Sequence, residues 1–171
     1  MRRHFLKKRE ARSLLDELAE RGISVEGLRG APVEVAEAPD GARIFIINGV
    51  PLIAEKGGEK FPLLTAESAL KDMPALVVDM GAVPHICNGA DVMAPGVVEI
   101  RGEFGDGALV KVLDEKHGKA IAIGKALHAS DEIRSMGRGK VVENLHYVGD
   151  KLWRLVKELS RSISRRRAER L

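Results

Sequence analysis

The sequence of 171 residues contains no glutamine, a single cysteine and only six aromatic residues. Because Cys87 has no partner, an intramolecular disulfide is excluded, and a reducing compartment is indicated. So few aromatic side chains argue against a protein that reads single-stranded bases mainly by stacking. The absence of Gln together with 31% charged residues is typical of proteins from hot environments.

Long apolar runs are also missing. No window reaches the roughly 18 apolar residues that a membrane span needs. The basic start of the chain is not followed by the apolar stretch of a secretory signal. With 44% hydrophobic residues the chain has enough apolar material to fold. We therefore expect a soluble, cytoplasmic protein without a membrane partner.

Charge is distributed unevenly along the chain. Residues 1–12 hold six basic and one acidic side chain, residues 150–171 hold eight and three, and residues 13–149 hold the remaining 14 and 21. These segments carry +5, +5 and −7, which sum to the net charge of +3. Basic blocks at both ends of an acidic body favour a polyanionic partner over a surface that is merely solvated.

Residues 1–73 are predicted to form a small α+β domain. Residues 9–21 place apolar side chains at helical spacing, and Gly22 stands where a left-handed helix cap belongs. Thr65 is expected to cap a second, short helix. An Asn48-Gly49 turn is a strong hairpin signal. Three segments have the pattern of antiparallel strands: 33–37, 42–48 and 50–55.

Residues 74–153 are predicted to form a second domain of small-barrel type. Short strands recur about every ten residues with turn residues between them, which indicates a barrel or a sandwich. Ser130 is expected to cap a short helix before the last strand. The expected strands are 75–79, 97–102, 109–115, 119–127 and 141–149.

The chain is expected to end in a basic helix, whose extension beyond the barrel is residues 154–171. One face of this helix is apolar and needs a surface to pack on, the chain's own barrel by default or else a partner protein. The apolar positions are Leu152, Leu155, Val156, Leu159 and Ile163.

Residues 89–96 form the most informative segment of the second domain. Gly89 and Gly96 bracket this segment, so its backbone can approach a ligand closely, and its N–H groups can bond phosphate or ribose oxygens. An ordinary connection between a helix and a strand would explain the glycines equally well.

Further residues of the second domain form a recognisable pattern: Asp79-x-Gly81-Ala82, Gly89-Ala90-x-x-Met93-x-Pro95-Gly96-Val97, Gly124 and Ala126. In this pattern the domain resembles the PUA domain, an RNA-binding module. The segment from Glu143 to Trp153, with the hairpin of the first domain, is similar to the malignant-T-cell-amplified-sequence family of translation factors. The resemblance covers roughly residues 30–153 and implies an α+β fold: a pre-PUA domain, a PUA pseudo-barrel and a C-terminal basic helix.

The resemblance also implies a site. In PUA domains the loop and the neighbouring last strand contact RNA, which corresponds here to Gly89, Ala90, Asp91, Val92, Met93, Ala94, Pro95, Gly96, Asn144, His146 and Tyr147. The basic blocks predict phosphate contacts at Arg2, Arg3, Lys7, Lys8, Arg165, Arg166 and Arg167. Family partners would be the small ribosomal subunit, tRNA and a density-regulated-protein-like factor.

No catalytic or metal-binding constellation is recognised. A zinc site needs about four N or S ligands, and His85 and Cys87 lack companions. Residues 137–140 lack both the first Gly and the Ser/Thr of a phosphate-binding loop. We therefore expect no metal, no cofactor and no enzymatic activity.

Three functions are compatible with these patterns. The first is a non-enzymatic protein that binds tRNA or small-subunit rRNA in translation initiation or ribosome recycling. The second is an accessory or specificity protein for tRNA or rRNA modification. The third is a protein-interaction scaffold in which the apolar face of residues 150–163 docks a partner helix.

Overall fold

The computed structural model describes residues 1–170, and the chain divides into two compact units. The first unit combines Met1–Lys71 with the C-terminal segment that begins at Lys151, and the second is Asp72–Asp150. No helix in the described part of the chain has both the length and the apolar character that crossing a bilayer requires.

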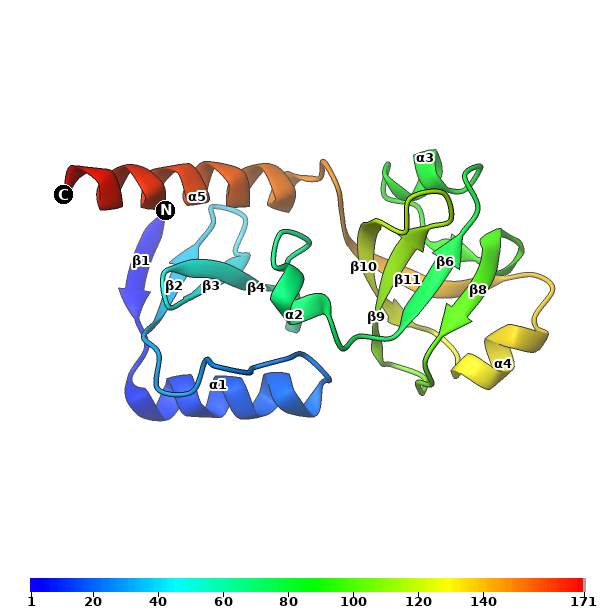
Figure 1. Ribbon diagram of the computed structural model, residues 1–171, viewed down its shortest axis with the longest axis horizontal. Coiled ribbons are helices and arrows are strands. Elements are labelled where there is room, and N and C mark those ends of the chain that lie inside the picture. The colour runs from blue at the N-terminus through cyan, green and yellow to red at the C-terminus, as the bar shows by residue number, and fades with distance from the viewer. Residues whose placement is uncertain (171) are drawn as a thin grey trace. The chain divides into compact units, whose positions relative to one another are not determined.

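A five-stranded antiparallel sheet forms the centre of the first unit, with strand order β1-β2-β3-β4-β5 (Figure 1). The strands are β1 (Arg2–Phe5), β2 (Val33–Glu37), β3 (Arg43–Ile47), β4 (Val50–Lys56) and β5 (Glu59–Pro62). The predicted three-stranded meander is confirmed, and so is its turn, since Asn48 and Gly49 have φ of 53° and 80°. The edge strands β1 and β5 were not predicted.

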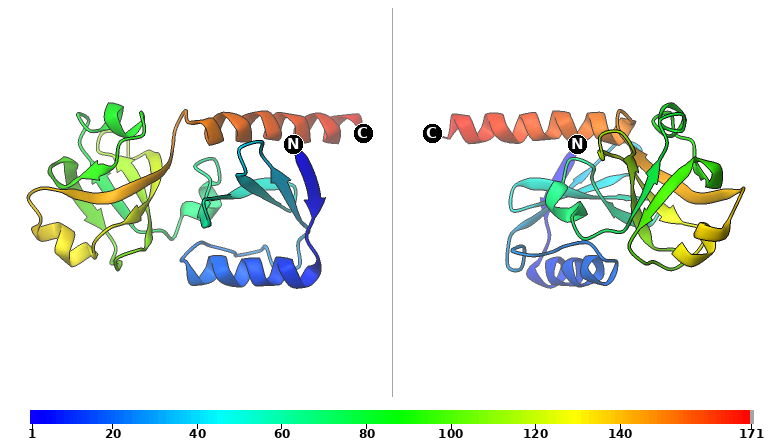
Figure 2. Two further views of the ribbon diagram at one scale, coloured as in Figure 1. Left: turned by 180° about the vertical axis from the view of Figure 1, so that it is seen from behind. Right: turned by 45° about the vertical axis from the view of Figure 1, so that its right-hand side comes forward.

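Helices α1 (Lys8–Glu20) and α5 (Lys151–Glu169) lie on opposite faces of this sheet (Figures 1 and 2). At the start of α1 the Lys7 N–H donates to Glu10 Oε1 at 3.0 Å. Its predicted C-terminal cap is confirmed, because Gly22 has φ of 81°. The short helix α2 (Glu67–Leu70) corrects one expectation: its N-cap residue is Ala66, without a side-chain cap, rather than Thr65.

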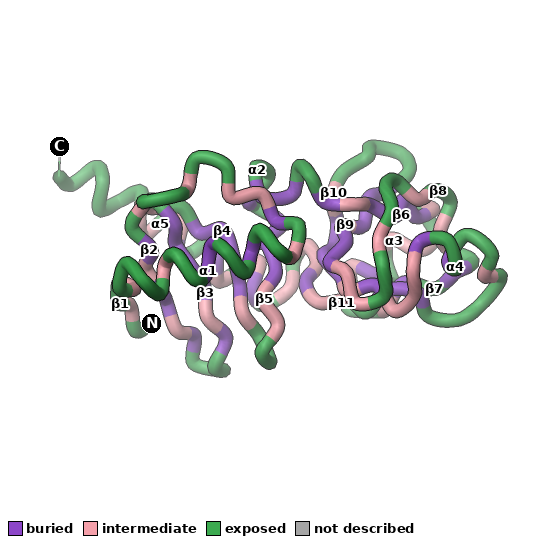
Figure 3. Tube along the Cα trace, turned by 90° about the horizontal axis from the view of Figure 1, so that it is seen from below, coloured by how far each residue is buried: buried purple, intermediate pink, exposed green. Residues whose placement is uncertain are grey.

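The central strand explains why two helices are needed. Ile44, Phe45, Ile46 and Ile47 are each no more than 2% exposed. Because side chains alternate between the faces of a sheet, four consecutive buried residues require cover on both faces. The covering side chains, all buried, are Leu14, Leu15 and Leu18 of α1 and Leu152, Val156 and Leu159 of α5. Buried residues also predominate along the central strands β3 and β4 (purple in Figure 3).

The apolar stripe of α5 therefore has an intrachain partner that differs from the expected one. The helix packs against β4 in the first unit, whereas the sequence favoured packing on the barrel. It also starts at Lys151, inside the range 74–153 assigned to the barrel domain. The chain thus passes through the second unit and returns to complete the first.

The second unit contains a six-stranded sheet with order β7-β11-β10-β9-β6-β8. Its strands are β6 (Ala75–Val78), β7 (Val92–Met93), β8 (Val97–Arg101), β9 (Leu109–Asp114), β10 (Ala120–Ala126) and β11 (Lys140–Tyr147). Its helices are α3 (Val83–Ile86), the 3-10 turn η1 (Ala94–Gly96) and α4 (Ser130–Ser135). All pairings are antiparallel except that of β6 with β9. The sheet and α3 enclose one apolar core that includes Leu76, Ile86, Val112 and Val142.

Gly124 lies at an irregularity in the β10–β11 pairing that brings the two strands very close together. The register shifts between Ile123 and Gly124. A Cβ atom built on Gly124 would lie only 2.6 Å from the carbonyl oxygen of Glu143, and it would also overlap a methyl group of Val142. Since one of these neighbours is backbone, the position requires glycine.

We predict that Gly124→Ala lowers the free energy of unfolding by about 1–3 kcal/mol, because the added methyl group overpacks the close contact between β10 and β11. Urea denaturation would measure the loss. Gly137→Ala is the matched control, since a Cβ at Gly137 has no neighbouring heavy atom within 4 Å. Equal stability of the two variants would contradict this account of Gly124.

Asp114 organises the turn between β9 and β10. Its pKa is lowered mainly because the His117 N–H donates to Oδ1 at 2.5 Å, which outweighs the opposing effect of burial. The Lys119 N–H donates to Oδ2 at 3.2 Å and lowers the pKa further. The ionised carboxylate is therefore the form that holds the turn.

This geometry predicts the pH dependence of stability. Because the folded-state pKa of Asp114 lies below the unfolded value of about 3.9, its contribution is present above that value and is lost as the pH falls through the folded pKa. Asp114→Asn should be less stable than the original protein at neutral pH, with the difference disappearing on acidification. Denaturation midpoints across this range test the prediction, and Asp106→Asn on an exposed turn controls for net charge. A difference that is independent of pH would disprove it.

Candidate nucleic-acid interface

The loop of residues 89–96 is held to α3 by backbone hydrogen bonds. The N–H groups of Gly89 and Ala90 donate to the carbonyls of Ile86 and His85, each at 3.0 Å. Gly89 has φ of 96°, a conformation that favours glycine. A Cβ at this position would lie 3.5 Å from the Tyr147 ring, so the loop backbone packs directly against β11.

The second half of the loop is equally well connected. The Ala94 N–H donates to the Gly139 carbonyl at 2.8 Å, and the Gly96 carbonyl accepts from the Asp79 N–H at 2.9 Å. A Cβ on Gly96 would lie 3.2 Å from Cβ of Ala82, so glycine permits the close approach of these two turns. The N–H groups of Gly89, Ala90 and Ala94 are thus used inside the unit, which corrects the expectation that they could bond a phosphate.

Asn144 joins the loop to β11. Its side-chain amide donates to the carbonyls of Ile86 and Ala90, both at 3.0 Å, and its own N–H donates to Asp91 Oδ1 at 2.9 Å. Asp91 Oδ2 lies 3.3 Å from the Nζ of Lys140. The carboxylate of Asp91 therefore holds the loop in place, and Lys140 balances the one negative charge that the loop carries.

His146 does not face a ligand. The residue is only 1% exposed, and its Nδ1 lies 2.9 Å from Asp150 Oδ2, the same oxygen that accepts the Tyr147 N–H at 3.0 Å. The expectation that His146 contacts RNA is corrected accordingly, because its ring is enclosed by the fold and secures the end of β11. Val92 and Ala94 are also buried and support the loop from below.

The exposed part of this surface is mostly apolar, with a basic edge. Met93 is 45% exposed, and Ala90 and Pro95 are exposed beside it. Lys140 pairs across the strands with Met93, and Arg138 is exposed one residue before the Gly139 that bonds the loop. Arg138 and Lys140 were not predicted as site residues. Their glycine-flanked spacing, Gly137-Arg138-Gly139-Lys140, was the signal that could have identified them.

Cys87 lies at the edge of the apolar core of the second unit. Burial raises the pKa of its thiol, so the side chain stays protonated and apolar in character. Within residues 1–170, no three His, Cys, Asp or Glu side chains are grouped in a way that could hold a metal ion.

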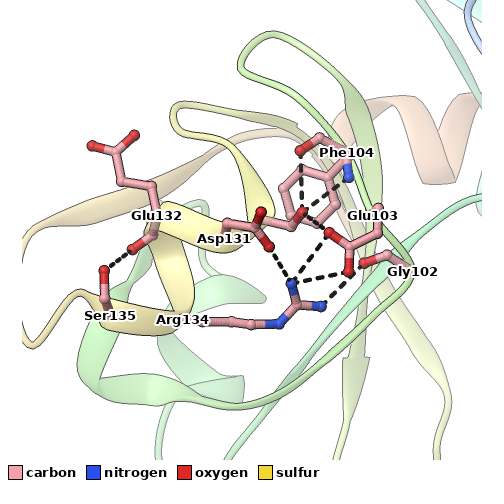
Figure 4. Close-up of polar contacts among 8 residues, drawn as sticks. Gly102, Glu103, Phe104, Asp131, Glu132, Arg134 and Ser135 are labelled. Carbon is pink, nitrogen blue, oxygen red and sulfur yellow. Dashed lines mark hydrogen bonds and ion pairs between the residues drawn. The ribbon is translucent and has the colours of Figure 1, made fainter.

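A cluster around α4 brings a serine, a carboxylate and an arginine together (Figure 4). Ser130 Oγ donates to Glu103 Oε2 at 2.9 Å and accepts from the Phe104 N–H at 3.1 Å. The Ser130 hydrogen bond is the main cause that lowers the pKa of Glu103, and Arg134 contributes. A general base that activates a serine at neutral pH needs a raised pKa, so the lowered pKa of Glu103 does not fit that role. The cluster instead anchors the loop before β9. The prediction that Ser130 caps α4 is wrong, because Ser130 is the first residue of the helix and the N-cap residue is Ala129.

The predicted basic residues are distributed over several places in the first unit. Arg3, Arg166 and Arg167 line one groove between β1, the Asn48-Gly49 turn and the end of α5. Lys7 precedes α1, and Lys8 lines a different groove beside Arg12 and Arg29. Arg2 lies on the strand β1 next to Arg3, so its side chain points to the opposite face of the sheet. Arg165 is exposed on α5 outside these grooves.

Comparison with known protein families identifies both parts of the chain. Residues 74–148 match the PUA domain, and residues 2–66 match a domain of unknown function, DUF1947. The PUA domain is an RNA-binding module. The fold and these matches thus define the class: a protein in which an N-terminal DUF1947 domain precedes a PUA domain.

Relatives extend this assignment over most of the chain. An uncharacterized protein of Methanocaldococcus jannaschii is 36% identical over 157 residues, 89% of this chain and 95% of the relative. Translation machinery-associated protein 20 of Saccharomyces cerevisiae is 27% identical over 128 residues, 71% of both chains. Malignant T-cell-amplified sequence 1-B of Xenopus laevis is 26% identical over 129 residues, 72% of this chain and 71% of the relative.

Solved structures agree with these relationships. A PUA domain protein from Aeropyrum pernix K1, in complex with tartrate, has a TM-score of 0.83 and 29% identity, covering 93% of this chain and 92% of that one. A hypothetical protein from Pyrococcus horikoshii OT3 has a TM-score of 0.79 and 34% identity, covering 91% and 99%. The chain belongs to the family that joins DUF1947 to a PUA domain, and it is a relative of the malignant T-cell-amplified sequence proteins. The resemblance inferred from the sequence is confirmed.

The role of Asn144 can be tested directly. Asn144→Ala removes two hydrogen bonds to the carbonyls of Ile86 and Ala90 and should cost about 1–3 kcal/mol of unfolding free energy. The amides of Gly89 and Ala90 should also exchange faster with solvent, because the loop loses its link to β11. Urea denaturation and amide hydrogen exchange measure the two effects. The matched control is Asn88→Ala, at an exposed position of the turn that contains Gly89, and it should change neither measurement.

Proposed function

We propose that the protein binds structured RNA, either tRNA or the rRNA of the small ribosomal subunit, and acts in translation initiation or ribosome recycling without catalysing a reaction. The observation that carries this proposal is the Gly89–Gly96 loop, which β11 holds in a defined shape within a PUA domain. A preformed loop loses little conformational entropy on binding, so it is suited to recognising the shape of a folded RNA.

The chemistry of the loop surface supports shape recognition with local phosphate contacts. Met93 presents an apolar side chain, which can pack against a sugar or the face of a base. Arg138 and Lys140 border the loop and supply positive charge, part of which neutralises Asp91. The three internally bonded N–H groups keep the backbone rigid. Because these three groups are already bonded, we expect exposed side chains to make most of the RNA contacts.

The assignment to translation is supported by the relatives. Translation machinery-associated protein 20 and the malignant T-cell-amplified sequence proteins match this chain over about seven-tenths of its length, a span longer than the PUA domain alone. This favours a shared role of the two-domain arrangement over a PUA domain that serves a modification enzyme.

A charge introduced at the loop tests the proposal. Met93→Glu should weaken binding to purified tRNA or to isolated small ribosomal subunits about tenfold, equivalent to about 1.4 kcal/mol, because a carboxylate would face phosphates. Filter binding in a series of KCl concentrations provides the affinities. For the original protein we expect the logarithm of the affinity to fall with the logarithm of salt at a slope of about −3 to −5.

The matched control is Ser135→Glu. It adds the same charge at an exposed position of α4, which lies at the opposite end of the second unit from α3 (Figure 1). Its affinity should stay within about twofold of the original. Failure of the unaltered protein to bind either RNA would refute the proposed function. Equal losses in Met93→Glu and Ser135→Glu would refute the placement of the interface at the loop.

A further inference from the structure

The two basic ends of the sequence meet in one groove of the first unit. The groove lies between the edge strand β1, the Asn48-Gly49 turn and the last turns of α5, and its volume is about 380 Å³. Arg3 and Phe5 come from the N-terminal block, and Arg166, Arg167 and Arg170 come from the C-terminal block. The fold thus gathers charges that are more than 150 positions apart in sequence.

The groove is strongly positive. Four arginines and one carboxylate, Glu34, line it. Arg3 neutralises Glu34 through two hydrogen bonds, of 2.6 Å and 3.1 Å. Three unit charges remain, on Arg166, Arg167 and Arg170, and none of them forms an ion pair with any residue in 1–170.

The Asn48-Gly49 turn leaves room for one of these arginines. The guanidinium of Arg167 lies directly over Gly49, in space that any side chain at position 49 would occupy. Asn48 is exposed beside it and also lines the groove. A guanidinium next to an exposed amide can bind a phosphate with two parallel hydrogen bonds while the amide bonds a base edge.

Phe5 adds a feature that simple solvation of charge does not explain. Its side chain is 67% exposed, in a chain that has only six aromatic residues. Arginines near the end of a helix can be explained by the partial negative charge of that end. That partial charge does not explain an exposed aromatic ring in the same groove. A ring beside guanidinium groups offers a base a stacking surface and its phosphates a charged one.

We infer that this groove is a second RNA site, which binds an unpaired segment of RNA by stacking one base on Phe5 and holding the adjoining phosphates with Arg166, Arg167 and Arg170. The inference rests on the proposed RNA-binding function and adds to it the class of RNA, single-stranded, and a location in the N-terminal unit. The site is separate from the PUA loop, because every lining residue belongs to the first unit.

Fluorescence anisotropy of the full chain with a labelled ten-nucleotide oligouridylate tests the inference. Phe5→Ala should weaken binding about tenfold through the loss of stacking, and Phe5→Trp should restore it. Arg166→Ala should weaken binding by a similar factor and make the salt slope shallower by about 0.7, as expected for one fewer phosphate contact. The matched control is Arg161→Ala, an exposed arginine of α5 that does not line the groove.

A base analogue gives a second readout. An oligonucleotide with 2-aminopurine should show fluorescence quenching on binding to the original protein and to Phe5→Trp, but not to Phe5→Ala. All substituted side chains lie at the surface, so thermal unfolding should show that each variant is folded. Quenching that persists in Phe5→Ala would overturn the stacking contact.

The results also separate this inference from the proposed function. If tRNA or small subunits bind and Met93→Glu weakens that binding, while Phe5→Ala and Arg166→Ala leave oligouridylate affinity unchanged, the groove is not an RNA site and the PUA interface stands. Vesicles of phosphatidylglycerol provide a second test. Vesicle binding that is lost in Arg166→Ala, with unchanged oligouridylate affinity, would assign the groove to a lipid surface and overturn the inference.

Discussion

The sheet of the first unit must be covered on both faces, and this requirement determines how the two ends of the chain are used. Helix α1 follows β1 directly and covers one face, as is usual for neighbouring elements. The other face is covered by α5, which begins about 90 residues after the last strand of that sheet. Ile46 of the sheet and Ile163 of the helix line the same groove, so the apolar stripe of α5 and the buried face of β3 depend on each other.

The same requirement explains where the positive charge is located. The apolar side of α5 has to face the sheet, so the arginines that follow Ile163 are carried along β1 and the Asn48-Gly49 turn. A basic tail without an apolar stripe would be a mobile polyelectrolyte, which pays an entropy cost each time it binds. Here the packing of Leu152, Val156 and Leu159 fixes most of the helix in advance.

Much of the fold could be predicted from local signals. The Asn48-Gly49 turn and Gly22 both demand positive φ, and the structure has it at each. The strands β1 and β5 could not be predicted, because they are four residues long and rich in charge, and only their pairing with β2 and β4 makes them strands. Packing of α5 could not be predicted either, since an apolar stripe does not specify which of two apolar surfaces it will cover.

The loop shows the same division between local and long-range information. Its glycines were visible in the sequence. The need for glycine at position 89 is local, because φ is positive there, whereas at Gly96 it arises from the close approach of Ala82, a residue of another turn. The partners of its polar groups were not visible. Asn144 and Lys140 are about 50 residues away and reach the loop only through the pairing of β7 with β11. Burial of His146 likewise depends on the folded second unit as a whole. The sequence pattern therefore predicted an RNA contact for a residue that instead stabilises the end of β11.

Electrostatics give the two surfaces different roles. At the loop, the charge of Lys140 balances that of Asp91. This pair therefore neither repels RNA nor attracts it strongly. In the groove, the end of α5 contributes about −0.5 elementary charge, against three arginines without acidic partners among the described residues. The groove therefore stays positive despite the helix dipole. Under the proposed function, salt should weaken contacts of the first unit more than those at the loop, where recognition of shape is combined with phosphate contacts of Arg138 and Lys140.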